Sequence, residues 1–174
     1  MDDFIIMMHS NWMSNILKYN YTSRQNHYTL YIKNMNLIIE FIHEHILAID
    51  FAMFVLIWFV QLIAYPVFRN VSERDFQDWH PKYCRRISYF VLPLMTAQLF
   101  EAAAACFFIG GSLILSKAIL VVSAWLITFF ISAPIHQKLK VMGKNCKAID
   151  RLISTNWYRT VIWTLILLFS FLNY

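Results

Sequence analysis

Four apolar stretches constrain the fold of this chain more than any other feature of its sequence. They cover residues 46–68, 87–110, 118–135 and 157–172, and short basic or glycine-containing connections separate them. An α-helix needs about 20 apolar residues to cross about 30 Å of hydrocarbon, and each stretch reaches or approaches that length. The 174 residues leave no room for a separate soluble domain beside four spans. The sequence therefore predicts an all-α, integral-membrane four-helix bundle.

The first 34 residues differ from the rest in composition and periodicity. They are rich in Asn, Tyr and Ser and lack a sustained helical period, so they cannot bury their own backbone. We interpret residues 1–34 as a flexible tail and residues 35–174 as a single four-span bundle. The continuous helical pattern begins at Met35, so a translational start there is the alternative to Met1. We expect no secretory signal, because the longest apolar run of the tail is Phe4–Met8.

The charge pattern predicts the topology. The net charge is +5, but the basic residues lie beside the spans and form no single stripe, which favours anionic lipid headgroups as partners and argues against nucleic acid. Residues 69–86 and 138–151 each carry five Lys or Arg, whereas the second connection holds only Lys117. The positive-inside rule then makes both basic connections cytoplasmic and puts both chain ends on the outer side of a bacterial inner membrane.

Helix signals occur within and beside the connections. Ser72-x-x-Asp75 resembles a capping box and predicts a short helix, and Pro81 suits the first position of the next helix. Pro66 and Pro134 each follow a small or aromatic residue and are expected to end the first and third spans. Because the same feature occurs in both halves of the chain, we raise the hypothesis of a duplicated helix pair.

Two acidic residues lie inside the spans, where a charge is costly. Asp50 and Glu101 fall at similar depth in the outer half, on helix faces that carry other polar groups. One interpretation is a proton-transfer or metal-ligating pair with His43 or His45 as a third member. The other is structural hydrogen bonding that holds the helices together.

A second set of polar residues is expected at the cytoplasmic rim. His80 precedes the second span, His136 follows the third, and Asn156 opens the fourth, so they meet at one membrane edge. They could share a metal, a haem or an anionic headgroup, or they could only cap and hydrogen-bond. Arg159 is expected to extend to the headgroups. Cys84, Cys106 and Cys146 have no metal-ligand spacing and are interpreted as reduced structural thiols.

Several enzyme classes are excluded by motif. The chain has no desaturase-type histidine boxes, P-loop, dinucleotide fingerprint or nucleophile elbow. Three segments carry a resemblance: Leu56–Gln61 with Tyr65-Pro66-x-Phe68, Pro134-x-His136-x-x-Leu139, and Asn156-Trp157-x-Arg159-Thr160-x-x-Trp163. Over about residues 45–165 the chain resembles a group of small uncharacterised bacterial four-span proteins. More distantly it is similar to the anthrone-oxygenase-like family, which more often has Asn where His136 stands.

Two functions remain open from the sequence. The resemblance implies oxidation or binding of a lipophilic aromatic or quinone-like molecule, with Glu101, His136 and Asn156 as candidate catalytic residues. Metal candidates are His43, Asp50 and His80, and no cofactor is identified. The alternative is a non-enzymatic accessory or stabilising subunit, as a homo-oligomer or within a membrane complex.

Overall fold

The computed structural model describes residues 37 and 39–173, and the chain divides into two compact units, residues 1–41 and 42–174. In the first unit the described residues, 37 and 39–41, are helical. The predicted tail and the start at Met35 lie outside the described residues. The second unit contains the four apolar helical segments.

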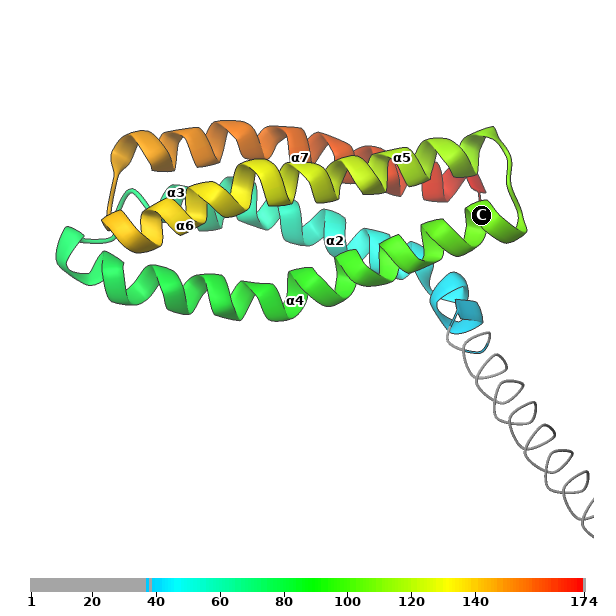
Figure 1. Cartoon of the computed structure of the whole chain (residues 1–174), viewed down its shortest axis with the longest axis horizontal. Coiled ribbons are helices and arrows are strands. Elements are labelled where there is room, and N and C mark those ends of the chain that lie inside the picture. The colour runs from blue at the N-terminus through cyan, green and yellow to red at the C-terminus, as the bar shows by residue number, and fades with distance from the viewer. Residues whose placement is uncertain (1–36, 38, 174) are drawn as a thin grey trace, which may run out of the picture. The chain divides into compact units, whose positions relative to one another are not determined.

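The second unit is an all-α bundle of four helical segments joined by short connections (Figure 1). In chain order they are α2 (Ile46–Phe59) with the π-helical turn η1 (Val60–Ala64) and α3 (Tyr65–Val67), α4 (Glu73–Phe108), α5 (Ser112–Ile127) with the π-helical turn η2 (Thr128–Ser132) and α6 (Ala133–Met142), and α7 (Cys146–Asn173). Each segment is long and apolar enough to cross a membrane. The predicted fold class is confirmed.

Local signals explain where the segments begin and end. The Ser72 hydroxyl accepts a hydrogen bond from the Asp75 backbone N–H at 3.2 Å and caps α4. Gly110 and Gly111 have positive φ values of 70° and 106°, which suit the tight turn between α4 and α5. Gly143 ends α6 with φ 74°, and Asn145 accepts a hydrogen bond from the Ala148 backbone N–H at the start of α7.

The helix that starts at Ser72 is not short. It continues through Pro81 and Pro93 to Phe108, so the prediction that Pro81 opens a new helix was wrong. Phe76 and His80 on this first part of α4 are fully buried, and Phe76 packs against Phe68. That packing favours one continuous helix over a break at the proline.

The third span also begins earlier than predicted. The structure starts α5 at Ser112, six residues before the predicted boundary, and therefore places Lys117 within the helix and not in the connection. The fourth segment begins at Cys146, well before Trp157. The sequence boundaries followed hydropathy, whereas the helices extend into their polar ends.

Each of the two π-helical turns is followed closely by a proline. Pro66 lies two residues after η1 and Pro134 two residues after η2. Proline has no N–H and its ring clashes with the carbonyl four residues earlier, so the helix accommodates it by widening at the preceding turn. Pro134 does not end the third span as predicted, because α6 continues to Met142.

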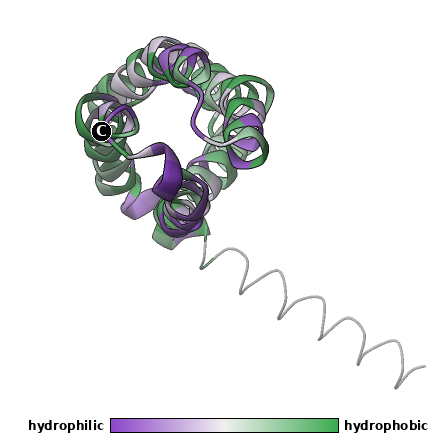
Figure 2. Cartoon of the chain, turned by 90° about the vertical axis from the view of Figure 1, so that its left-hand side faces the viewer, coloured by the Kyte–Doolittle hydropathy of each residue, from purple (hydrophilic) through white to green (hydrophobic). Residues whose placement is uncertain are grey.

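The outside of the bundle carries large apolar side chains. Phe51, Phe90, Phe130, Val161 and Leu168 are each more than half exposed. Figure 2, viewed along the bundle, shows hydrophobic residues on all four segments. Such a surface suits contact with hydrocarbon. The backbone groups of a helix hydrogen-bond within the helix, so they need no water there. The chain is a multi-pass membrane protein.

Basic connections gather at one end of the bundle. The connection after α3 and the connection before α7 meet there (Figure 1). The Arg69 guanidinium pairs with Asp150 at 2.7 Å, and the Lys144 ammonium donates hydrogen bonds to the Arg69 and Val71 carbonyl oxygens at 2.9 and 2.7 Å. We call the end of the bundle where these two connections meet the basic end.

Candidate functional site

Buried and half-buried polar side chains form two separate groups inside the bundle. One, the acid–lysine cluster, contains Asp50, Glu101 and Lys117. The other, the rim cluster, contains His80, Cys84 and His136 together with Tyr65 and lies toward the basic end. Glu101 and His80 are 21 residues apart in α4, or about 30 Å at 1.5 Å per residue.

Lys117 forms ion pairs with both intramembrane acids. Its ammonium lies 2.9 Å from Asp50 Oδ2 and 3.5 Å from Glu101 Oε2. All three side chains are buried. The sequence prediction missed this partner because it placed Lys117 in a connection, whereas the structure places it within α5. The cluster explains how two acidic residues are tolerated within the spans.

Neighbouring polar groups complete the acid–lysine cluster. Gln98 Nε2 donates to Asp50 Oδ1 at 2.6 Å, and Trp163 Nε1 donates to Gln98 Oε1 at 3.1 Å. Ser170 also donates to Asp50, and His43 Nδ1 lies 3.2 Å from Glu101 Oε1. The Asp50 carboxylate is therefore held by α4, α5 and α7 at once. These contacts match the structural interpretation of the sequence better than a free proton-transfer pair.

The three metal candidates from the sequence do not form one site. His43 and Asp50 belong to the acid–lysine cluster, where Lys117 and Ser170 occupy the Asp50 carboxylate. His80 lies in the rim cluster and its nearest polar neighbours are His136 and Cys84. A small cavity of about 160 Å³ beside Glu101 and Lys117 is separated from the rim cluster by most of the length of α4.

The rim cluster brings three ligand-type atoms together. His80 Nε2 lies 3.1 Å from His136 Nδ1, and Cys84 Sγ lies 3.5 and 3.6 Å from the same two nitrogen atoms. The other ring nitrogen of His136, Nε2, is 3.1 Å from the Tyr65 hydroxyl. The prediction that His80 and His136 meet at one membrane edge is confirmed. Cys84 was missed as a member, although its i, i+4 spacing from His80 on one helix was the available signal.

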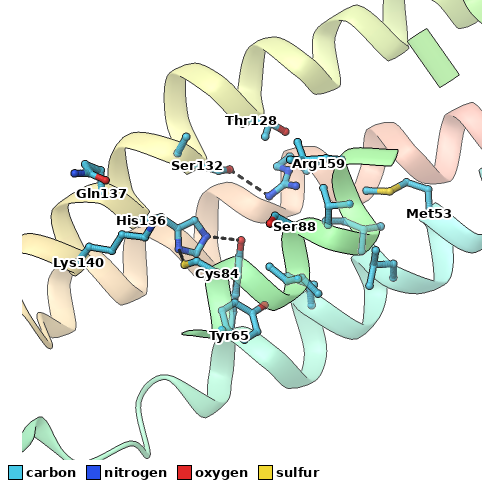
Figure 3. A pocket seen from close by; sticks show the side chains of 18 residues that line it. Met53, Tyr65, Cys84, Ser88, Thr128, Ser132, His136, Gln137, Lys140 and Arg159 are labelled. Carbon is cyan, nitrogen blue, oxygen red and sulfur yellow. Dashed lines mark hydrogen bonds between the residues drawn. The ribbon is translucent and has the colours of Figure 1, made fainter. Parts of the chain in front are cut away.

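A cavity of about 290 Å³ lies beside the rim cluster; we call it the main cavity. Much of its wall is apolar and comes from α2, η1 and α4: Met53, Leu56, Ile57, Val60, Ile87, Val91 and Leu92. A polar region of the wall contains Tyr65, Cys84, His136 and Arg159 (Figure 3). Tyr83 also lines the cavity. Leu92, Gln137 and Lys140 are exposed, so the cavity opens on the flank between α4 and α6.

Arg159 supplies a buried positive charge to the main cavity. It is only 5% exposed, so the expectation that it extends to the headgroups was wrong. Its guanidinium donates to Ser132 and Asn156 at 3.4 and 3.2 Å and lies 5.1 Å from the Trp163 ring centre. Among the residues that the structure describes, no carboxylate pairs with it. Gln61 accepts from Asn156 Nδ2 at 2.8 Å and so helps to fix the side chain that holds Arg159.

The structure places the three catalytic residues predicted from the sequence at three different positions. His136 lines the main cavity. Asn156 is fully buried behind Arg159 and positions its guanidinium. Glu101 lies in the acid–lysine cluster and lines the small cavity. Of the three, only His136 contacts the space in which a ligand-sized molecule fits.

Comparison of this chain with protein-family models, with curated proteins and with solved structures finds no match.

Proposed function

We propose that this protein binds a lipophilic small molecule, aromatic or quinone-like, whose oxygen-bearing head lies against Arg159 in the main cavity. The observation that supports the proposal is a buried cation that faces an apolar, ligand-sized space. Small-molecule sites are typically apolar with a few convergent polar groups, and their volumes begin at about 300 Å³. The main cavity, at about 290 Å³, lies at that lower limit and suits a compact ring.

Unpaired donors on the cavity wall define the head group. Arg159 Nε and the Tyr83 hydroxyl are buried without a hydrogen-bond partner among the described residues. A buried donor that lacks a partner costs about 1–3 kcal/mol, so a ligand that accepts from both is favoured. A carbonyl, phenolate or carboxylate oxygen accepts hydrogen bonds, and an anionic oxygen also offsets the Arg159 charge.

Binding is better supported than proton abstraction at this site. Both ring nitrogens of His136 have polar neighbours, Nδ1 facing His80 and Cys84 and Nε2 facing Tyr65. A histidine engaged at both nitrogens has no free position for a general base. The residues around the main cavity therefore favour binding of the molecule over its oxidation.

We place the protein in a bacterial inner membrane with the basic end toward the cytoplasm and both chain ends outside. The positive-inside rule supports this orientation, and both basic connections lie at the same end of the bundle. The lipid-facing opening between α4 and α6 then admits a ligand directly from the bilayer.

Filling the main cavity tests the proposal. Leu92→Trp inserts a large side chain at the cavity opening, whereas Leu126→Trp makes the same change at a similarly exposed site of α5 that does not line the cavity. After purification in mild detergent, solvent extracts are analysed by mass spectrometry, and decylubiquinone and oleate are titrated while tryptophan fluorescence is recorded. We expect Leu92→Trp to lower ligand content or affinity at least about tenfold, because its indole occupies space that the ligand needs, and Leu126→Trp to leave both unchanged.

The probes also separate the head-group classes. Preferential binding of decylubiquinone indicates a carbonyl head, and preferential binding of oleate indicates a carboxylate. If neither probe binds, no molecule co-purifies and Leu92→Trp is silent, the proposal is wrong. That result would favour the accessory-subunit hypothesis, in which the inward polar residues only join the helices.

A further inference from the structure

We infer that His80, Cys84 and His136 form a zinc-binding site inside the bundle. The inference does not depend on the ligand proposed for the main cavity. It rests on the convergence of three ligand atoms from two helices onto one point, with His80 and Cys84 on α4 and His136 on α6.

The distances between the three atoms are those of a tetrahedral zinc site. With Zn–N of about 2.05 Å and Zn–S of about 2.3 Å, tetrahedral angles put two nitrogen ligands about 3.3 Å apart and a nitrogen and a sulfur about 3.6 Å apart. The His80–His136 nitrogen distance is 3.1 Å, and the two sulfur–nitrogen distances are 3.5 and 3.6 Å. All three agree with the expected separations to within a few tenths of an ångström.

Hydrogen bonding alone explains this arrangement less well. A hydrogen bond pairs a single donor with a single acceptor, and a thiol carries one weak donor. Here the sulfur is nearly equidistant from two ring nitrogens that also face each other. Three atoms at nearly equal separations surround a common point, which is the geometry that a shared cation requires.

The surroundings hold the ligands in place. His80 is fully buried. The Phe76 ring stacks on its imidazole with 5.2 Å between the ring centres, and the Phe68 ring packs edge-on with 5.4 Å between the ring centres. Tyr65 lies 3.1 Å from the second nitrogen of His136 and fixes the orientation of that ring. Metal-bound histidines usually have such a partner on the other nitrogen, and its loss typically lowers metal affinity 10–100-fold.

The donor set favours zinc. One thiolate and two imidazoles are ligands that zinc prefers, and three protein ligands leave a fourth position for water or another small ligand. Cys84 and His136 also line the main cavity, so that fourth ligand can come from the cavity. Copper uses the same donors in a trigonal arrangement, and the experiment below separates the two metals.

Cobalt substitution tests the site directly. The protein is prepared without a histidine tag as the double variant Cys106→Ser/Cys146→Ser, which leaves Cys84 as the sole thiol. The metal-free protein is titrated with Co²⁺, and Zn²⁺ is then added in competition. We expect one equivalent of Co²⁺ with tetrahedral visible bands and a near-ultraviolet thiolate-to-cobalt band, both abolished by one equivalent of Zn²⁺.

Ligand variants and a matched control assign the signal. Cys84→Ser removes the thiolate band, His80→Gln and His136→Gln each lower Co²⁺ affinity at least about tenfold, and Tyr65→Phe lowers it about tenfold or more. His43→Gln, the control in the acid–lysine cluster, leaves affinity and spectrum unchanged. If the double variant does not fold, the wild-type chain is compared with Cys84→Ser in the same way.

Three results would overturn the proposal. Absence of a thiolate band in folded protein that unfolds cooperatively is the first. Unchanged Co²⁺ affinity in Cys84→Ser is the second. The third is bound copper in place of zinc, measured by elemental analysis of the untagged protein as purified, which would identify a copper site instead.

Discussion

At the scale of single residues, Lys117 decides whether two intramembrane acids stabilise the bundle or disrupt it. Replacement by Met keeps the length and apolar stem of the side chain but removes the charge that faces Asp50 and Glu101. Breaking a buried ion pair by removing one partner costs about 3–5 kcal/mol, because the remaining charge is left uncompensated. We expect Lys117→Met to lower the thermal unfolding midpoint in detergent by many degrees.

The control for this prediction is Lys138→Met, which removes an exposed lysine of α6 and should be nearly silent. Adding Asp50→Asn to Lys117→Met should restore part of the lost stability, since the uncompensated charge disappears along with its partner. Equal stability of Lys117→Met and the wild-type protein would show that the cluster is not an ion-paired structural element.

Individual polar residues were predicted unevenly from the sequence. The periodicity placed Asp50, Glu101 and Asn156 on inward faces, and the structure buries all three. Arg159 was assigned to the headgroups because a long basic side chain near a helix end usually reaches water; only the tertiary structure shows Ser132 and Asn156 beside it. Cys84 was overlooked although it lies four residues after His80, and its other partner, His136, is 52 residues away, a separation that no local spacing rule detects.

At the scale of helical elements, the π-helical turn η2 sets the direction in which His136 points. A π turn inserts one extra residue, so its removal would rotate the following side chains by about 100° around the helix axis. Pro134→Ala restores the backbone N–H and removes the ring that clashes with the preceding turn. We expect this variant to fold with wild-type stability or better and to lose Co²⁺ affinity at least about tenfold, because His136 turns away from His80 and Cys84.

Pro93→Ala is the matched control for the π-turn prediction. Pro93 is exposed within α4, and no π-helical turn precedes it within that helix among the described elements. Its replacement should leave Co²⁺ affinity unchanged. Wild-type affinity in Pro134→Ala would mean that packing, and not the proline, fixes the orientation of His136.

Helix existence followed from hydropathy, whereas helix boundaries did not. The four apolar stretches were correctly predicted as spans, because nothing but a helix satisfies a backbone of that length in hydrocarbon. Pro81 and Pro134 misled the boundary prediction, since packing of Phe76 and the η2 turn carry each helix past its proline. The repeated order of π turn and then proline agrees with the hypothesis of a duplicated helix pair, which stays a prediction.

At the scale of the whole molecule, the charge asymmetry of the bundle predicts its orientation. The connections after α3 and before α7 carry Arg69 and Lys144 at the basic end, where Arg69 pairs with Asp150 and Lys144 binds two backbone carbonyls. The positive-inside rule predicts that this end faces the cytoplasm. The opposite end, at the turn between α4 and α5, carries Gly110, Gly111 and Ser112 without a basic side chain.

Native Cys146 gives a direct test of that orientation. It is exposed at the start of α7, at the basic end, whereas Cys84 and Cys106 are half-buried and are replaced by Ser to leave one reporter. In intact cells we expect Cys146 to react with a membrane-permeant maleimide and to resist an impermeant one. Ser112→Cys in a chain that lacks the three native cysteines should react with both, because Ser112 is exposed at the opposite end. Protection of Ser112→Cys, together with labelling of Cys146 by the impermeant reagent, would show the opposite topology. Because the main cavity lies closer to the basic end, it would then open toward the outer leaflet.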